Sequence, residues 1–189
     1  MENNFAYYRA QSALSLDWSR IRYFQKDEFP QEEIEFLNKY VIEELDKLRD
    51  VLVTPIQISP AKGAVVRFPQ TEDGQPTSWH DSCETRKLGQ AIDIFIPDTH
   101  KLFCVDLLIK VFGNTRFRGV GFYFDTNYEG QPTVMLHLDL RHRPTLWYCP
   151  RRSENTRRDY NFSTNKANFL TELEKNWIDF HHENLLKNA

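Results

Sequence analysis

The chain has 189 residues, of which 40% are hydrophobic and 14% aromatic, and its formal net charge is -3. This length and apolar content suit one compact domain with a substantial core. The weakly acidic balance excludes a surface devoted to phosphate backbones, because such binding requires clustered positive charge, so we expect no nucleic-acid partner.

Cysteine usage and the N-terminal sequence bear on the compartment. Cys83, Cys104 and Cys149 are widely separated, odd in number and form no C-x-x-C pair, which predicts reduced thiols. The opening MENNFAYYRAQSALSL lacks a basic segment followed by an apolar run, and no stretch is long enough to span a bilayer. We therefore expect neither a signal peptide nor a membrane partner.

The first elements along the chain are a helix and short strands. Apolar residues recur at spacings of three and four over about residues 30–49, which predicts a helix with Pro30 near its first turn. The β-branched VLVTPIQI, interrupted by Pro55, predicts a strand near a sheet edge. A further strand is expected over residues 64–68.

The middle of the chain changes from polar to apolar. Residues 69–87, with Gly74 and Pro76, predict a long loop, and loops of this length in compact domains are commonly functional. The apolar run AIDIFI then predicts a buried strand. A helix follows that carries Leu102, Phe103, Leu107, Leu108 and Val111.

The last third predicts a hairpin and a terminal helix. RGVGFYF and TVMLHLDL flank the turn-rich DTNYEGQP, as in a β-hairpin. Phe169, Leu173, Trp177 and Phe180 mark an amphipathic helix. We expect an α+β domain over residues 1–160 and a C-terminal helical extension over residues 161–189.

Polar residues inside two apolar strands are the candidates for chemistry. Side chains alternate between the faces of a strand, so in TVMLHLDLR the residues His137, Asp139 and Arg141 share one face and the leucines share the other. Asp93 interrupts the apolar AIDIFI, and a buried carboxylate is costly unless a cation meets it. An ordinary alternative is that the histidine is hydrogen-bonded in the core and that Asp139 pairs with Arg141.

Asp93 and His137 are two of the three protein ligands that a catalytic zinc site needs, and the polar loop before Asp93 contributes His80 as the third. We therefore predict a Zn²⁺ site on His80, Asp93 and His137 with an open position for water. A nearby carboxylate would transfer the proton. Asp139 is the nearest such group in the sequence, with Asp125 and Glu129 as alternatives.

The order of these residues resembles the zinc D-Ala-D-Ala carboxypeptidase family, whose fold also occurs in hedgehog signalling domains. The family motifs S-x-H and Gly-x-Ala-x-Asp are matched by Ser78–His80 and Gly89–Asp93. Gly-[IV]-Gly-x-Tyr is matched by Gly119–Tyr123, and H-x-D-x-R followed by a Trp is matched by His137–Arg141 and Trp147. The segments RYFQKDEF and LDKLRDVLVTPIQIS extend the resemblance, which covers about residues 16–147.

The resemblance implies a fold, a site and an activity. The fold would be a small antiparallel sheet flanked by helices, and His80, Asp93 and His137 would bind zinc. Arg67 and Arg141 would bind the substrate, Arg67 as a bidentate partner of a carboxylate. The activity would be hydrolysis of peptide bonds in bacterial peptidoglycan, as a carboxypeptidase or endopeptidase. Such an enzyme would be a phage-type endolysin, a virion protein with phage structural partners or a wall-remodelling enzyme, held in the virion or cytoplasm until released to the wall.

One spacing leaves two alignments open. The family form is H-x-x-G, whereas DSCETRKL separates His80 from Gly89 in this chain. Without an insertion Arg86 falls at the ligand position, and an arginine cannot ligate zinc, which implies a non-catalytic structural or binding module, for instance in a phage virion. With an insertion, His80 is retained as the ligand, and this is the alignment that we adopt.

Overall fold

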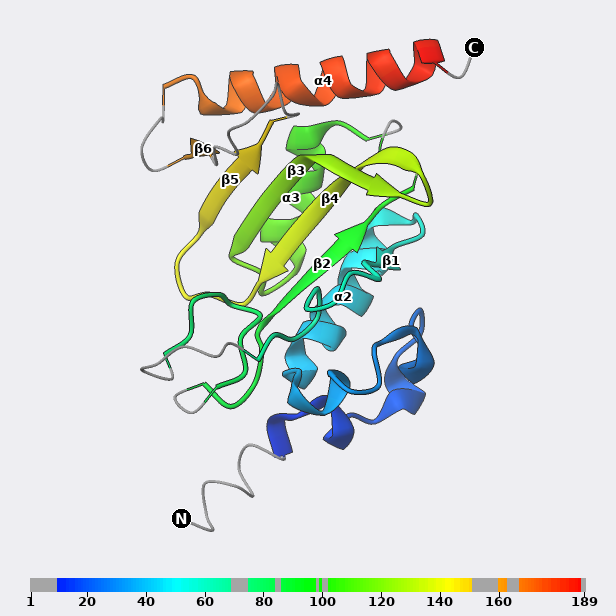
Figure 1. Ribbon diagram of the computed structural model, residues 1–189, viewed down its shortest axis with the longest axis vertical. Coiled ribbons are helices and arrows are strands. Elements are labelled where there is room, and N and C mark those ends of the chain that lie inside the picture. Colours follow the sequence, from blue (N-terminus) through cyan, green and yellow to red (C-terminus); the bar gives the residue numbers. More distant parts are fainter. Residues whose placement is uncertain are drawn as a thin grey trace.

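A β-sheet and three α-helices make up the part of the chain that the computed structural model describes, namely residues 10–68, 75–83, 86–97, 99, 102–150, 160–162 and 167–187. Two helices lie behind the sheet and the third crosses one end of it (Figure 1). The α+β class predicted from the sequence is confirmed. None of the described helices is long and apolar enough to cross a membrane.

The sheet is mixed, with the order β1-β2-β4-β3-β5-β6 over the described residues. Its strands are β1 (Gln57–Ile58), β2 (Ala91–Phe95), β3 (Gly119–Tyr128), β4 (Gln131–Asp139), β5 (Thr145–Cys149) and β6 (Tyr160–Asn161). The predicted antiparallel sheet is wrong in one respect, because β5 runs parallel to β3. Strand β3 lies between β4 and β5. It pairs antiparallel with β4 and parallel with β5, so β4 and β5 run in opposite directions.

The predicted hairpin and the predicted buried strand are both confirmed. Strands β3 and β4 pair over most of their length, and the turn between them places Glu129 and Gly130 at φ 51° and 78°. Glycine adopts such positive φ values without steric cost, which favours the turn at this point. Every residue of β2, the AIDIF segment, is buried.

The described residues form three α-helices, two on the side of the sheet away from the viewer in Figure 1 and one across an end of the sheet. They are α2 (Lys39–Leu52), α3 (Cys104–Asn114) and α4 (Phe169–Lys187). The predicted C-terminal amphipathic helix is therefore confirmed as α4. Its buried residues join the same hydrophobic cluster as the strands, and the Trp177 indole donates to the carbonyl of Leu102 at 3.0 Å.

Helix α2 begins later than the apolar spacing predicts. Residues 34–36 form a 3-10 turn, and the side chain of Asn38 caps the helix by accepting from the main-chain N–H of Tyr40. The main chain just before α2 pairs with Gly89, whose N–H donates to Phe36 and whose carbonyl accepts from Asn38. Those pairings are incompatible with a helix over the same residues, although the apolar residues of the predicted stripe are all buried.

The strand predicted for VLVTPIQI is much shorter than the segment. Val51 and Leu52 continue α2, which ends where Val53 takes a left-handed conformation with φ 56° two residues before Pro55. Only β1 remains as a strand, and it lies at the sheet edge as predicted. The strand expected over residues 64–68 is reduced to an isolated bridge between Arg67 and Asp81.

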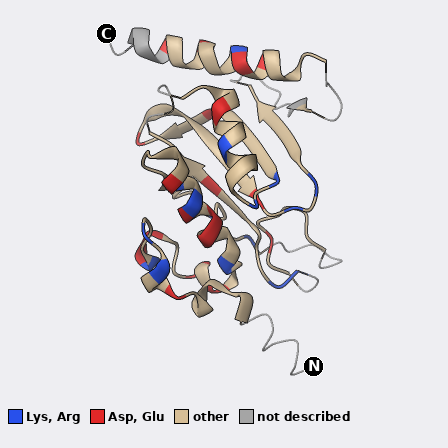
Figure 2. Ribbon diagram, turned by 180° about the vertical axis from the view of Figure 1, so that it is seen from behind, with Lys and Arg blue, Asp and Glu red and all other residues tan. Residues whose placement is uncertain are grey.

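Figure 2 shows Lys and Arg positions interspersed with Asp and Glu positions along the helical side of the ribbon. One acid there is buried: Glu44 on α2 accepts from Lys47 and from the Arg116 guanidinium, both at 2.7 Å. Burial alone would raise the pKa of Glu44, but these two cations lower it below its ordinary value. The Arg116 contact joins α2 to the segment that leads into β3.

Candidate metal centre

Two of the three predicted ligands occupy paired positions on neighbouring strands. Asp93 on β2 pairs with His137 on β4, and His137 pairs with Gly121 on β3. Gly121 in turn pairs with Trp147 on β5. Residues directly opposite each other project from the same face of a sheet. The sheet register therefore aligns these four positions in a row, which we call the Asp93 row.

Two glycines on β3 make room for side chains from the strands on either side. A Cβ atom at Gly121 would overlap the Trp147 ring, and one at Gly119 would overlap the Asp139 carboxylate. Because both overlaps are far inside van der Waals contact, a side chain at either position would displace its neighbour. The Trp147 ring consequently lies over β3, with its centroid 5.2 Å from that of the His137 ring.

His80 reaches the Asp93 row from the polar segment that precedes β2. Asp81 closes a turn around it, because one carboxylate oxygen accepts from the main-chain N–H groups of Thr77 and Ser78 at 2.6 and 2.7 Å. The carbonyl of His80 accepts from the N–H of Arg67 at 3.0 Å. These main-chain contacts hold the imidazole over the sheet although no regular element carries it.

The residues between His80 and β2 do not displace the histidine. The N–H of Cys83 donates to the carbonyl of Arg86 at 2.7 Å, which brings these two residues together. The Arg86 guanidinium stacks over the Trp79 ring at 4.4 Å and donates to the carbonyl of Ser78 at 2.7 Å. His80, and not Arg86, thus meets Asp93 and His137.

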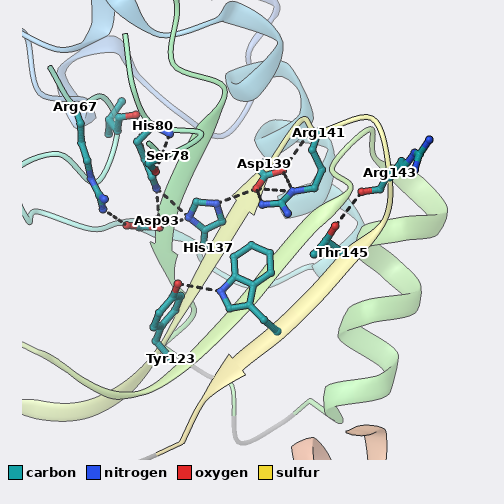
Figure 3. A network of polar contacts seen from close by, with 12 residues as sticks. Arg67, Ser78, His80, Asp93, Tyr123, His137, Asp139, Arg141, Arg143 and Thr145 are labelled. Carbon is teal, nitrogen blue, oxygen red and sulfur yellow. Dashed lines mark hydrogen bonds and ion pairs between the residues drawn. The ribbon is translucent and has the colours of Figure 1, made fainter. Parts of the chain in front are cut away.

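The three predicted ligands converge on a small triangle of atoms (Figure 3). His80 Nε2 lies 2.9 Å from His137 Nδ1 and 3.2 Å from Asp93 Oδ1, and His137 Nδ1 lies 2.9 Å from Asp93 Oδ1. The exposed fractions of His80, Asp93 and His137 are 1%, 5% and 7%. All three ligand residues are therefore buried, His80 most completely.

The hydrogen bonds on the far sides of the two rings assign their tautomers. His80 Nδ1 faces the carbonyl of Val65 at 3.3 Å, and a carbonyl can only accept, so the hydrogen is on Nδ1. His137 Nε2 faces the carboxylate of Asp139 at 3.1 Å, so its hydrogen is on Nε2. The two nitrogens inside the triangle then carry lone pairs, and with the Asp93 oxygen they make three acceptors with no donor among them.

The surrounding charges favour a positive charge inside this triangle. Burial would raise the pKa of Asp93, but the neighbouring imidazoles of His137 and His80, which can become charged, hold it well below its usual range. Burial would also raise the pKa of Asp139, but His137 and Arg141 lower it to about 2. Burial would lower the pKa of His137, yet the two carboxylates raise it. The site thus demands either a second proton on a ring or a cation.

A metal ion satisfies this demand more completely than a proton. One proton bridges a single edge of the triangle, whereas an ion at its centre meets all three acceptors. Tetrahedral zinc with bonds of about 2.0–2.1 Å places its ligand atoms about 3.3 Å apart. The observed edges of 2.9–3.2 Å are close to that spacing. Two imidazoles and a carboxylate can therefore hold a metal ion here, and zinc itself stays a prediction.

Asp139, the predicted proton-transfer group, lies on the opposite side of the His137 ring from the triangle. Besides accepting from His137, its carboxylate accepts from Arg141 Nε at 2.7 Å, and it is fully buried. The Arg141 guanidinium packs over the Trp147 ring at 4.8 Å. Because Asp139 and Arg141 are paired with each other, the geometry favours an orienting role for both over proton transfer and substrate binding.

The other predicted residues lie at different distances from the triangle. Arg67 is at its edge, with Nη2 3.9 Å from Asp93 Oδ2 and a side chain that is half exposed. Asp125 lies about 13 Å along β3 from Gly121, and Glu129 is in the hairpin turn, about 20 Å from His137 along β4. Of the predicted substrate and proton-transfer groups, Arg67 is the one whose half-exposed side chain lies beside Asp93.

Comparisons of this chain with family models, with curated proteins and with solved structures found no match. The site therefore rests on its own geometry and on the sequence motifs.

Sequence reasoning missed Glu33, which anchors the segment that the His80 ring contacts. Glu33 is buried and accepts from the N–H groups of Gly63 and Val66 at 3.1 and 2.8 Å. This anchors the segment whose carbonyl at Val65 accepts from the His80 ring. Glu33 follows another glutamate in the sequence, so no local signal distinguishes it as the buried one.

Proposed function

We propose that the chain is a zinc metallopeptidase with the hedgehog/D-Ala-D-Ala peptidase fold, and that it hydrolyses peptide bonds of bacterial peptidoglycan. The observation that carries the proposal is the triangle of three buried acceptor atoms from His80, Asp93 and His137. The substrate class is supported by the ordered motifs that resemble the carboxypeptidase family.

In this proposal each residue at the centre has a separate task. His80, Asp93 and His137 hold the ion, which when bound supplies a Lewis acid for the scissile carbonyl and a lowered pKa for an attacking water. Asp139 keeps the His137 ring in the tautomer that presents Nδ1 to the ion. Arg67 binds a carboxylate of the substrate beside Asp93, because its guanidinium is half exposed there.

A paired measurement of metal and product tests the proposal. Purified protein is expected to carry about one equivalent of zinc by mass spectrometry and to release stem-peptide fragments from purified peptidoglycan. His137→Ala should lose both the metal and the products, whereas His142→Ala, at an exposed position after β4, should keep both. A wild-type protein without metal and without products refutes the proposal.

A second candidate, a metal-holding module without catalysis, is favoured by one observation. Among the described residues, the two carboxylates in contact with the triangle are Asp93, which is itself in the triangle, and Asp139, which lies behind His137. Neither is placed as a separate proton acceptor beside the triangle. Such a module would serve as a structural or binding part, for instance of a phage virion.

The same experiment separates the two candidates. Stoichiometric zinc together with no peptide release from any peptidoglycan preparation would identify the non-catalytic module. Release that depends on Arg67 would favour the peptidase: Arg67→Ala should raise KM for a substrate with a free carboxylate, with the zinc content unchanged. Arg118→Ala is a suitable control, since that guanidinium donates to the carbonyls of Thr115 and Phe117 at the start of β3.

A further inference from the structure

A partly exposed tyrosine lies next to the Asp93 row. Tyr123 is two positions along β3 from Gly121 and pairs with Met135 on β4, so it projects from the same face as His137. Its side chain is intermediate in exposure, in contrast to the three buried ligands. Figure 3 shows the hydroxyl end of Tyr123 directed back toward His137.

A hydrogen bond from Trp147 holds this hydroxyl in place. The indole Nε1 lies 3.0 Å from the Tyr123 oxygen, and because an indole N–H can only donate, the tyrosine oxygen accepts. The O–H hydrogen of Tyr123 must then be directed away from the indole. Donation by Trp147 also polarises the phenol and makes it a stronger donor.

Trp147 in turn is held relative to the triangle. Its ring centroid lies 5.2 Å from that of His137, and Gly121 leaves the space that the indole fills. The path from the triangle to the phenol therefore passes through His137 and Trp147. Both residues are buried, and both lie on strands that pair with β3. A donor group positioned by such contacts keeps its place during a reaction, which is the requirement for stabilising charge in a transition state.

We propose that Tyr123 is a catalytic residue whose hydroxyl donates a hydrogen bond to the carbonyl oxygen of the scissile bond as that oxygen becomes negative. This inference rests on the proposed peptidase function. When water adds to the carbonyl carbon, the π electron pair of the carbonyl moves to its oxygen, and the phenol keeps its own hydrogen while donating. Trp147 is a positioning residue that acts through Tyr123.

Binding of a tetrahedral analogue tests this contact without turnover. The probe is a phosphinic-acid analogue of D-alanyl-D-alanine, whose charged oxygens imitate the oxyanion, titrated into zinc-loaded protein by calorimetry. Tyr123→Phe should weaken binding by about 10- to 100-fold, somewhat less than the loss in kcat on removal of an oxyanion donor. Trp147→Phe keeps an aromatic ring beside His137 but removes the N–H, and should weaken binding by a smaller factor.

Tyr128→Phe is the matched control. Tyr128 is on the same strand, but its ring packs against Phe95 with centroids 4.9 Å apart, whereas the Tyr123 hydroxyl accepts from Trp147. This variant should bind the analogue as the wild type does. Equal affinity of Tyr123→Phe and wild type overturns the inference, and so does loss of zinc from Tyr123→Phe, which would make the hydroxyl merely structural.

The outcome is separable from that of the proposed function. If the wild type releases no peptide but its affinity for the analogue still depends on the Tyr123 hydroxyl, the peptidase fails and the contact stands. If the wild type releases peptide while Tyr123→Phe retains full kcat and full analogue affinity, the function stands and the contact fails. Zinc-loaded wild type that does not bind the analogue at all also overturns the contact.

Discussion

The two faces of β4 meet different surroundings although their residues alternate along one strand. Val134, Leu136 and Leu138 are fully buried in the hydrophobic cluster under the helices. His137 and Asp139 project from the other face into hydrogen-bonded contacts with charged groups. Because the two faces have separate partners, substitutions on one face should alter stability and substitutions on the other should alter metal binding.

The largest expected effect is on the polar face. His137→Ala removes one of three ligand atoms and also the group that Asp139 orients, so zinc content should fall from about one equivalent to none. Circular dichroism of the metal-free variant should still show the helices and the sheet. A variant that keeps its zinc would show that the triangle is not the metal site.

The corresponding change on the apolar face should act on stability. Leu138→Ala removes a fully buried side chain, and such truncations cost about 2–5 kcal/mol of unfolding free energy. Urea denaturation should detect this loss, whereas zinc affinity of the folded variant should stay within about twofold of the wild type. A large drop in zinc affinity without loss of stability would contradict the separation of the faces.

Asp139→Asn should have a smaller effect on the metal site, beside the loss of the ion pair with Arg141. The amide is nearly isosteric but no longer anionic, so it weakens the orientation and basicity of the His137 ring, and such changes lower metal affinity by about 10- to 100-fold. Competition with a chromophoric chelator measures the shift. Asp106→Asn, at an exposed position on α3, should bind zinc as the wild type does.

The smallest expected effect is a pH dependence of stability, and its sign differs between the metal-free protein and the contribution from zinc. Burial would lower the pKa of His137 but Asp139 and Asp93 raise it, so in metal-free protein its charged form stabilises the fold below about pH 6.5. That contribution is lost as the pH rises through the elevated pKa. Zinc binding requires the neutral ring, so zinc affinity should rise over the same interval.

Denaturation in a chelator at pH 6 and pH 8, repeated with excess zinc, measures how the free energy of unfolding and its zinc-induced increase change with pH. For the His137 contribution, stability should fall with pH in the chelator and the zinc-induced increase should grow with pH. The His137→Ala variant should lack both components. If, in wild type, stability in the chelator and the zinc-induced increase changed in the same direction with pH, the idea that proton and metal compete for the triangle would be contradicted.

The local pattern was enough to predict several parts of this molecule. The alternation in TVMLHLDL assigns His137 and Leu138 to opposite faces of a strand, and the apolar AIDIFI predicts a buried strand that isolates Asp93. The candidate ligands could be named in advance for the same reason, since a carboxylate in an apolar strand needs a partner. His80 depended on the resemblance, because a histidine in a polar loop carries no signal of its own.

Other features depend on contacts between distant segments. Pairing of Gly89 with Phe36 and Asn38 delays the start of α2, and a spacing rule for apolar residues cannot detect it. The role of Asp139 likewise follows from its position behind the His137 ring, next to Arg141. A sequence places Asp139 two residues from His137 but does not show which ring nitrogen it faces.

Side-chain periodicity and polarity are properties of neighbouring residues, and they were sufficient to identify β2, the β3–β4 hairpin and two ligand candidates, Asp93 and His137. The parallel placement of β5, the indole of Trp147 over Gly121 and the choice of His80 over Arg86 arise from non-local packing. The physical reason is that a local period sets which face a side chain occupies, whereas strand order and register depend on the total free energy of the packed core.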